Sequence, residues 1–299
     1  MKHTLTSKGL TWTNVQSPEP EELAEFVRLV QPLPGDAEFI AQDHRRPEVA
    51  IRPDYILLLI HVPVFDRKAR VTRGAALYFV IKEHELFSLH YEPIVILDRI
   101  RRSFEESPER QEEYFEDEAA SLALYIVSLL YDSAFQKLER LGKHVDIAEE
   151  AVFQGNERKM VEEISVLTRD VMDFRKVIRP QKSLFSTTVT HPLVTLDAAA
   201  RWRRVHGQLL RMWEILEGMF ESVRELASTN FTLLQHKENE LLRVLTIYSM
   251  IAVPAFILVA PFNVPSVEFS SPLFYGFIWL VVTFTLILIL IFARSRRWR

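Results

Sequence analysis

The chain has 299 residues, of which 48% are hydrophobic and 25% charged, and its formal net charge is −4 at pH 7. A negative net charge argues against nucleic acid as the main partner. The absence of cysteine excludes disulfides, thiolate metal sites and cysteine nucleophiles. Most charges precede Arg243, and Glu268 is the only carboxylate between Arg243 and Arg294. The C-terminal part therefore has the composition of a membrane domain.

The N-terminal region, residues 1–110, alternates β-rich runs with helical ones. The run "EPEELAEFVRLV" predicts a helix that begins after Ser17 and Pro18, because small polar, proline and acidic residues suit a helix N-terminus. The run "DYILLLIHVPVF" from Asp54 predicts a strand, and "ALYFVIKEHELFSLHY" from Ala76 predicts a hairpin with a polar turn at "KEHE". We therefore expect an α/β domain here.

Helical periodicity takes over in residues 111–242, for which we predict a helical stalk. A first apolar stripe contains Leu122, Ile126, Leu129 and Leu130. A second series advances by three and four residues, as in a coiled coil, through Leu209, Trp213, Leu216, Phe220, Val223, Ala227, Leu234 and Leu241. We predict a turn within residues 183–192, followed by one helix from about Asp197 that continues into the next segment.

The C-terminal region, residues 243–299, contains two uncharged runs, near 244–262 and 273–293. At about 1.5 Å per residue, each run is long enough to cross the ~30 Å hydrocarbon core of a bilayer. Two buried helices of a soluble protein are the alternative, which uncharged runs of this length disfavour. We predict two membrane-spanning helices, the first continuous with the stalk.

The flanking charges predict how the spans are oriented. Lys237 and Arg243 precede the first span, "RSRRWR" follows the second, and the connecting loop has neither lysine nor arginine. By the positive-inside rule, both ends of the membrane domain face the cytoplasm. The first residues lack the apolar core of a signal peptide, so we expect the N-terminal region to be cytoplasmic too.

No arrangement typical of a catalytic site is found in the sequence. The nine histidines are scattered without metal-ligand or acid-plus-histidine spacing, and the chain has no glycine-rich phosphate loop and no nucleophile elbow. The residues that catalysis would need are not clustered. We therefore predict that the protein is not an enzyme and has no cofactor.

Four stretches, taken in order, resemble the CorA family of divalent-cation channels and transporters: "GLTWTNVQSPEPEELAEF", "AQDHRRPEVAIRPDYILLLIHVPVF", "RDVMDFRKVIRPQKSLF" and "ENELLRVLTI". The resemblance implies an α+β membrane protein that forms a funnel-shaped homopentamer in the bacterial inner membrane. The first spanning helix of each copy would line a central pore. The partners implied are further copies of the chain, membrane lipids and the transported divalent cation.

The family signature is Gly-Met-Asn at the outer end of the first span, where this chain has Pro261, Phe262 and Asn263. Only the asparagine is retained, slightly earlier along the helix than in the family. By resemblance, Asn263 lies at the pore mouth, where neutral carbonyls can order the water shell that Mg²⁺ gives up reluctantly. The alternative, compatible role is to end the helix and turn the chain.

Glu268 lies in the loop after this asparagine. In a pentamer it would form a ring of carboxylates near the mouth, which would raise the local concentration of cations. The alternative is a solvated loop residue with no role in transport.

Helical spacing places a further set of residues on one face of the first span: Asn239, Leu242, Thr246, Ser249, Val253, Phe256 and Ala260. By resemblance this face lines the pore, with Asn239 and Leu242 at its inner end. The hydroxyls of Thr246 and Ser249 can solvate an ion or bond to the preceding helical turn. A ring of Phe256 side chains would form a hydrophobic constriction.

The stretch "RWRRVHG", Arg201 to Gly207, stands where the family often has an acidic turn that binds intracellular divalent ions. Basic residues such as Arg203 and Arg204 would repel a divalent cation. We therefore expect the usual metal-sensing site to be missing or moved.

Two classes of function remain open at this point. The first is a divalent-cation channel or transporter, for Mg²⁺ above all, with Zn²⁺, Co²⁺ and Ni²⁺ as alternatives. The second is a structural or regulatory membrane-anchored oligomer whose pore is lost or nonselective. The residues do not distinguish passive conduction from proton-coupled transport.

Overall fold

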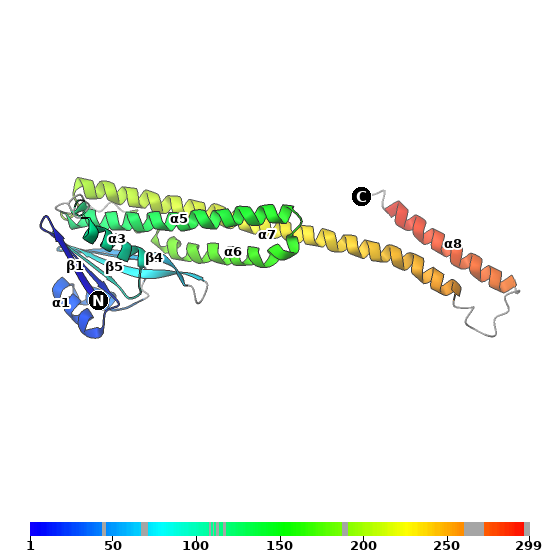
Figure 1. Cartoon of the computed structure of the whole chain (residues 1–299), viewed down its shortest axis with the longest axis horizontal. Coiled ribbons are helices and arrows are strands. Elements are labelled where there is room, and N and C mark those ends of the chain that lie inside the picture. Colours follow the sequence, from blue (N-terminus) through cyan, green and yellow to red (C-terminus); the bar gives the residue numbers. More distant parts are fainter. Residues whose placement is uncertain are drawn as a thin grey trace. The chain divides into compact units, whose positions relative to one another are not determined.

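The computed structural model describes residues 1–43, 46–66, 71–107, 109, 111, 114–115, 118–186, 191–259 and 272–295. The chain divides into two compact units, Met1–Ser228 and Thr229–Arg299. The long helix α7, Leu196–Val259, contributes residues to both units (Figure 1). The single helix expected from about Asp197 is therefore confirmed.

The first unit contains a six-stranded sheet in the order β1-β2-β6-β5-β4-β3. The strands are β1 Lys2–Ser7, β2 Leu10–Gln16, β3 Glu48–Ile51, β4 Ile56–Asp66, β5 Val71–Ile81 and β6 Glu85–His90. Only the β2–β6 pair is parallel among these neighbours, because the other strands pair antiparallel. The β5–β6 pairing confirms the hairpin predicted from Ala76.

The β1–β2 hairpin turns at two residues with positive φ, Lys8 at 48° and Gly9 at 80°. Two consecutive residues in the left-handed region match the right-handed twist of the strands that they join. Glycine adopts this conformation without a steric penalty, so Gly9 suits the second position.

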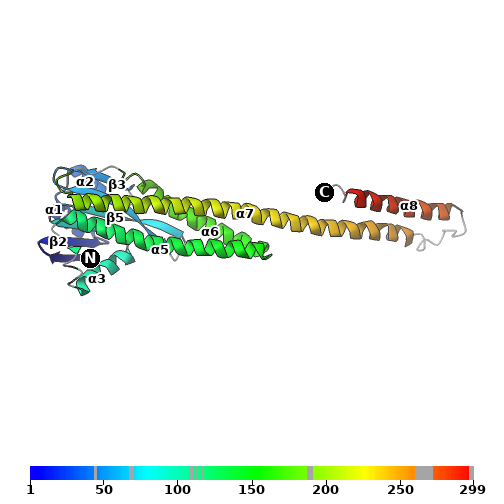
Figure 2. The ribbon, with the colours of Figure 1, turned by 90° about the horizontal axis from the view of Figure 1, so that it is seen from above.

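Helices cover both faces of the sheet, because β4 and β5 are apolar on both sides. One face, with Leu57, Leu59 and Tyr78, packs against α1 Pro20–Val30 and α2 Pro34–Ile40. The opposite face, with Leu58 and Phe79, packs against the long helices. The predicted α/β domain is thus a layered structure with the sheet between two helical layers (Figures 1 and 2).

The helix predicted after Ser17 and Pro18 is α1, which begins at Pro20. Glu19 is the N-cap residue, and its backbone N–H donates to the Glu22 carboxylate at 3.2 Å. The hydroxyl of Ser17 instead donates to the carbonyl of Tyr91 at 2.9 Å. Ser17 therefore ties the end of β2 to the end of β6 and does not cap the helix.

The helices on the second face are α3 Val95–Glu106, α5 Ala119–Phe153, α6 Glu157–Ile178 and the first part of α7, with the short 3-10 helix η1 Arg179–Gln181 after α6. Leu122, Ile126 and Leu130 are buried, and Leu129 packs against the core. These positions confirm the first apolar stripe.

The second apolar series is correct only in its first half. Leu209, Leu216 and Val223 are buried on α7. Ala227 and Leu241 are exposed, and the residue that is buried after Val223 is Leu226. A step of three residues from Val223 leads to Leu226 and keeps the buried stripe of the coiled-coil period. The predicted step of four leads to Ala227, which lies outside that stripe.

Gln181 joins three elements of this unit and is completely buried. Its amide nitrogen donates to the carbonyls of His61 and Val177, at 2.8 and 2.9 Å. Its amide oxygen accepts from the backbone N–H of His61 at 3.1 Å and from the hydroxyl of Tyr131 at 3.2 Å. One side chain thus links β4, α5 and the end of α6.

The second unit contains the rest of α7 and the helix α8, Pro272–Ser295. Both helices match the two predicted spans over their described residues. Pro254 lies inside α7. Proline removes one backbone hydrogen-bond donor from the helix, so the carbonyl one turn earlier lacks its usual partner.

Candidate functional site

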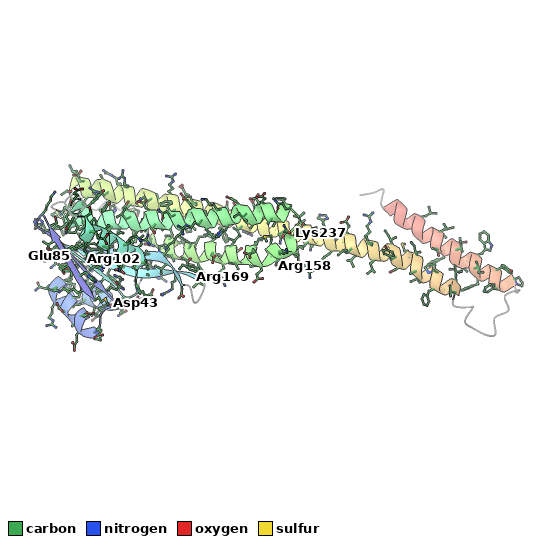
Figure 3. All side chains as sticks on the ribbon, viewed as in Figure 1. Asp43, Glu85, Arg102, Arg158, Arg169 and Lys237 are labelled. Atoms are coloured by element: carbon green, nitrogen blue, oxygen red, sulfur yellow. The ribbon has the colours of Figure 1, made fainter. Side chains whose placement is uncertain are left out.

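The helix α7 carries a long uncharged segment that is open to its surroundings. An 18-residue window of this helix is apolar enough to cross a membrane, and none of it is buried. Lys237, labelled in Figure 3, lies on α7 before this segment. Contiguous exposed apolar surface of this extent is rare on a soluble monomer, since water disfavours it. This part of α7 is suited to lipid or to a helical partner.

Helix α5 is also long and apolar enough to cross a membrane, but 61% of its apolar 18-residue segment is buried. Its buried residues include Leu122, Ile126 and Tyr131, which belong to the core beside the sheet. An apolar helix that is buried within a unit is a core helix, and α5 is therefore excluded as a span.

Helix α8 is the second apolar helix of the C-terminal unit. It is apolar over Phe274–Ile287, and large side chains such as Trp279 and Leu280 are exposed. The hydroxyls of Thr283 and Thr285 donate to the carbonyls of Trp279 and Val281, each at 2.7 Å. Such bonds to the preceding turn satisfy a hydroxyl in a medium that offers no water.

The predicted pore face lies on α7 over its described residues, and its members are exposed: Asn239, Leu242, Thr246, Ser249, Val253 and Phe256. The side chain of Phe256 is 82% exposed. The hydroxyl of Thr246 donates to the carbonyl of Leu242 at 2.8 Å, which is the back-bonding alternative considered above. Because the hydroxyl donates its hydrogen in this bond, both lone pairs of the oxygen stay available to an ion or a water molecule.

Three predicted site residues, Ala260, Asn263 and Glu268, lie outside the described residues. The roles assigned to them at the pore mouth stay predictions. The described part of the site is therefore the helix face that leads up to them.

A second stripe on α7 was not predicted. Met250, Pro254 and Leu258 are half-buried, at steps of four, among exposed neighbours. At 100° per residue this stripe lies about a third of a turn from the predicted pore face. Phe274, Ile278 and Val281 form a comparable stripe of lower exposure on α8. The sequence carried a signal for this second face, because apolar residues recur every four positions at Met250, Pro254 and Leu258.

The described residues contain no group of three or more histidine, aspartate or glutamate side chains placed to hold a metal ion. In the stretch expected to sense divalent ions, Arg203 and Arg204 are exposed on α7, while Trp202 and Val205 are buried. The two arginines thus present positive charge to the solvent, as the sequence indicated.

Together these features define an integral membrane protein. A packed α/β unit is followed by two apolar helices, and the first of these helices has a face on which polar and apolar side chains are mixed. Residues 7–296 match the family described as CorA-like Mg²⁺ transporter protein, and the chain belongs to this family. It is a transporter-family protein and not an enzyme, as predicted.

The chain is similar to the cobalt/magnesium transport protein CorA of Thermotoga maritima, with 22% identity over 251 residues that cover 82% of this chain and 70% of the relative. The solved CorA magnesium transporter from Methanocaldococcus jannaschii has a TM-score of 0.74 at 20% identity, over 98% of this chain and 92% of that chain. The full-length CmaX protein has a TM-score of 0.79 at 16% identity, over 96% and 88%. The two structures show that the fold is CorA-like along its full length.

Proposed function

We propose that the protein conducts a divalent cation, with Mg²⁺ as the favoured ion, through a central pore. The pore would be lined by the α7 helices of five copies of the chain. The observation that carries this proposal is the exposed face of α7. It combines Asn239, Thr246 and Ser249 with apolar residues on a helix that is otherwise suited to lipid. Intramembrane polar groups that face a pathway are a common basis of ion conduction.

The chemistry of this face suits a hydrated divalent ion. Mg²⁺ keeps several of its waters, and neutral amide and hydroxyl groups can bond to those waters without removing them. The uncharged segment places no carboxylate on the face, so the ion would not be trapped by a strong ligand. Conduction requires binding that is weak enough for the ion to leave.

The second stripe supports an arrangement in which α8 packs outside α7. Met250, Pro254 and Leu258 are the less exposed side of α7. Met250 borders the pore face, four residues after Thr246, whereas Pro254 and Leu258 lie on nearly the opposite side of the helix from Phe256. One helix can thus contact α8 and a central pathway at the same time. Phe256 would then form a ring of aromatic side chains that narrows the pathway and excludes water.

The proposed location is the bacterial inner membrane, with both ends of the chain in the cytoplasm. In functional terms, residues 1–110 would form the cytoplasmic α/β domain, residues 111–242 the stalk and residues 243–299 the membrane domain. Asn263 and Glu268 would face the outside, where Glu268 attracts cations and Asn263 orders their waters.

Control by intracellular divalent ions would not act through the Arg201–Gly207 stretch. Its exposed arginines repel divalent cations, because like charges raise the free energy of the bound state. If closure by divalent ions exists, we expect it to be unchanged in Arg203→Gln and Arg204→Gln. Loss of that closure in either variant would contradict this part of the proposal.

The test is uptake of Mg²⁺ into liposomes that contain the purified protein and a Mg²⁺-sensitive dye. We expect uptake by the unmodified protein and altered uptake in Asn263→Ala. We expect Phe256→Ala to raise the rate by about 10-fold, the effect of about 1.4 kcal/mol on a barrier. Phe284→Ala, an exposed aromatic on α8, is the matched control and should leave the rate unchanged.

The same assay separates the alternatives. Uptake of Zn²⁺, Co²⁺ or Ni²⁺ in place of Mg²⁺ would support conduction through a pore but would change the identity of the transported ion. The absence of uptake for every divalent ion would contradict conduction and leave a membrane-anchored oligomer with a structural or regulatory role.

A further inference from the structure

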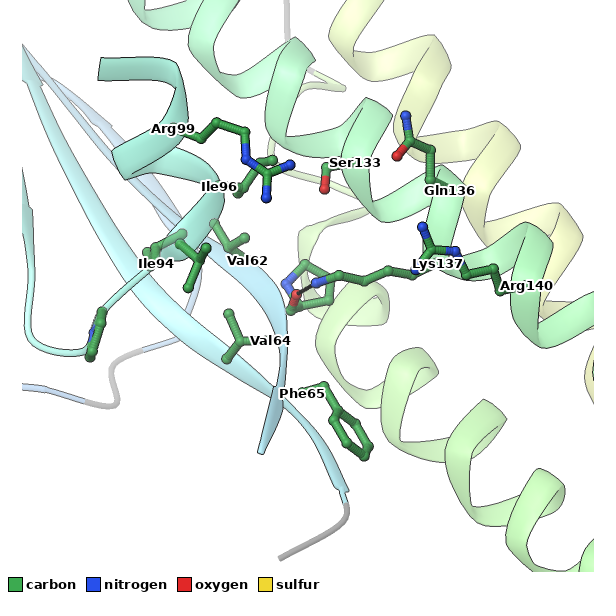
Figure 4. A pocket seen from close by; sticks show the side chains of 13 residues that line it. Val62, Val64, Phe65, Ile94, Ile96, Arg99, Ser133, Gln136, Lys137 and Arg140 are labelled. Atoms are coloured by element: carbon green, nitrogen blue, oxygen red, sulfur yellow. Dashed lines mark hydrogen bonds between the residues drawn. The ribbon is translucent and has the colours of Figure 1, made fainter. Parts of the chain in front are cut away.

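The first unit contains a pocket of about 340 Å³ that the proposed transport does not use. It lies where the middle of α5 faces the second half of β4 and the beginning of α3 (Figure 4). Val62 and Val64 of β4 and Ile94 and Ile96 before and within α3 supply apolar walls. Pockets of a few hundred Å³ with apolar walls and a few polar groups are typical of sites for small molecules.

Three cationic side chains line this pocket: Arg99 from α3, and Lys137 and Arg140 from α5. Figure 4 shows Arg99 directed toward α5 and Lys137 directed toward β4. None of the residues that line the pocket is an aspartate or glutamate. The pocket therefore concentrates positive charge without a carboxylate of its own to balance it.

The charges of this cluster are poorly compensated within the described part of the chain. Arg99 and Arg140 form no ion pair with any residue that the structure describes. Lys137 donates to the carbonyl of Pro63 at 2.6 Å, which is a neutral partner. Lys137 and Arg140 are three residues apart on one helix, where like charges repel each other.

The environment of Lys137 points the same way. Burial lowers the pKa of Lys137, and the nearby charge of Arg140 lowers it further. Both effects disfavour the charged ammonium group, whereas the negative charge of an anion in the pocket would favour it.

The shape and polarity of the pocket select the kind of anion. Arginine presents a planar set of donors that matches phosphate or carboxylate oxygens, and a dianion neutralises more of three cations than a monoanion does. Ser133 and Gln136 add neutral hydrogen-bonding groups beside the cations. The valine and isoleucine walls, with the exposed ring of Phe65 at the rim, suit an apolar body next to the charge.

We propose that this pocket is a binding site for a small organic phosphate, in which Arg99, Lys137 and Arg140 hold the phosphate group and the β4 and α3 side chains contact the apolar part. The proposal stands apart from the proposed transport, because every residue that it uses belongs to the first unit. It gives the cytoplasmic unit a ligand that differs in charge from the transported ion.

The proposal is tested by isothermal titration calorimetry with three probes. The full-length protein is kept in detergent, in a buffer free of Mg²⁺ and phosphate. Phenyl phosphate carries both features, inorganic phosphate carries only the charge, and benzoate carries the ring with a single charge. We expect phenyl phosphate to bind most tightly, by about 10-fold over each of the other two, since each lacks one feature worth about 1.4 kcal/mol.

Variants assign the binding to the pocket. Arg99→Gln and Arg140→Gln should each weaken phenyl phosphate by about 10-fold or more, the size of one lost charge-assisted interaction. Both arginines are exposed, so their replacement should leave the melting temperature unchanged. Arg102→Gln is the matched control, because Arg102 is an exposed arginine on α3 outside the pocket (Figure 3).

The possible outcomes all bear on the proposal. Tight phenyl phosphate binding that is lost in both pocket variants and kept in Arg102→Gln would support it. No binding of phenyl phosphate at millimolar concentration would overturn it. Equal binding of the three probes, or equal weakening by Arg102→Gln, would show nonspecific attraction of anions and would overturn it as well.

Discussion

The two units of the chain hold apolar side chains in opposite environments. In the first unit, Leu58 and Phe79 are completely buried between the sheet and the helices. In the second, Phe256 and Trp279 are 82% and 73% exposed. Transfer of apolar surface out of water drives the packing of the first unit. The exposed apolar side chains of the second unit are favourable only if water does not surround them. Membership of a family of membrane transporters indicates that lipid surrounds them instead.

Polar groups show the same contrast between the units. In the first unit they form specific long-range networks, as when the Asp36 carboxylate accepts from Arg52 at 2.7 Å and from the Tyr55 hydroxyl at 2.5 Å. In the second unit, the hydroxyls of Thr246, Thr283 and Thr285 bond within their own helices. A helix that satisfies its own polar groups can cross lipid without help from other elements.

Among substitutions that compare the two units, we expect the largest loss of stability from a change at Gln181. Gln181→Met removes all four hydrogen bonds of this buried side chain, two of which join it to the backbone of His61. At about 1 kcal/mol per bond, the free energy of unfolding should fall by about 4 kcal/mol. Chemical denaturation of the detergent-solubilised protein, followed by circular dichroism, measures this loss.

Gln235→Met is the control for this substitution, because Gln235 is exposed on α7 in the second unit. Its effect should stay within about 0.5 kcal/mol, as for most surface substitutions. Equal losses at both positions would mean that the hydrogen bonds of Gln181 do not hold the first unit together.

A charge placed on an exposed isoleucine should distinguish water from lipid. Ile147 on α5 and Ile251 on α7 have nearly the same exposure, 63% and 60%. A lysine in the middle of a spanning helix costs about 3 kcal/mol of insertion free energy. Ile251→Lys should therefore reduce the amount of protein that resists alkaline extraction from membranes. Ile147→Lys should not, and equal behaviour of the two variants would place both isoleucines in the same solvent.

A smaller, pH-dependent effect is expected from His90, which is completely buried on β6. Its Nδ1 donates to the carbonyl of Glu92 at 2.6 Å, and burial lowers its pKa despite this bond and the charge of Asp98. The unfolded chain therefore takes up a proton more readily than the folded one. Stability is fully present above the unfolded value of about 6.5 and is lost as the pH falls from there toward the lowered pKa.

Denaturation midpoints measured between pH 8 and pH 4 test this prediction. His90→Gln should lower the stability at pH 8 and flatten its dependence on pH below about 6.5. His236→Gln, at an exposed position of the second unit, should keep the dependence of the unmodified protein. An unchanged slope in His90→Gln would mean that another group titrates.

The smallest effect is expected at the surface of the first unit. Lys2 and Glu25 form an ion pair at 2.9 Å between partly exposed side chains. Lys2→Gln should change the free energy of unfolding by less than about 1 kcal/mol, and the change should shrink as salt is added. A larger, salt-independent loss would show that Lys2 contributes to the fold through its packing.

The sequence predicted what depends on local pattern. The β5–β6 hairpin, the start of α7 and the two uncharged helices follow from alternation, helical period and the distribution of charge. Contacts between distant segments could not be predicted in this way. Trp12, for example, donates to Ser88 at 2.9 Å, and Ser88 donates to Asn14 at 2.7 Å inside the sheet.

The candidate site was predictable to the same degree. Helical spacing alone placed Thr246 and Phe256 on one face of α7, because that face is a local property. The stripe through Pro254 depends on a partner helix, and the pocket of Arg99 and Lys137 depends on the packing of α3 and α5 against β4. Both required the folded chain.

In the proposed pore, one face of α7 borders water within the membrane while the rest of the helix does not. The chain has no cysteine, so single cysteines can be introduced without a background. The measurement is the rate at which a membrane-impermeant thiol reagent modifies Thr246→Cys, Ser249→Cys and Val253→Cys, compared with Ile251→Cys and Leu258→Cys, in liposomes that take up Mg²⁺. We predict rapid modification of the first three with loss of uptake, and slow modification of the other two without it. Equal rates on the two sides of the helix would contradict a pore lined by α7.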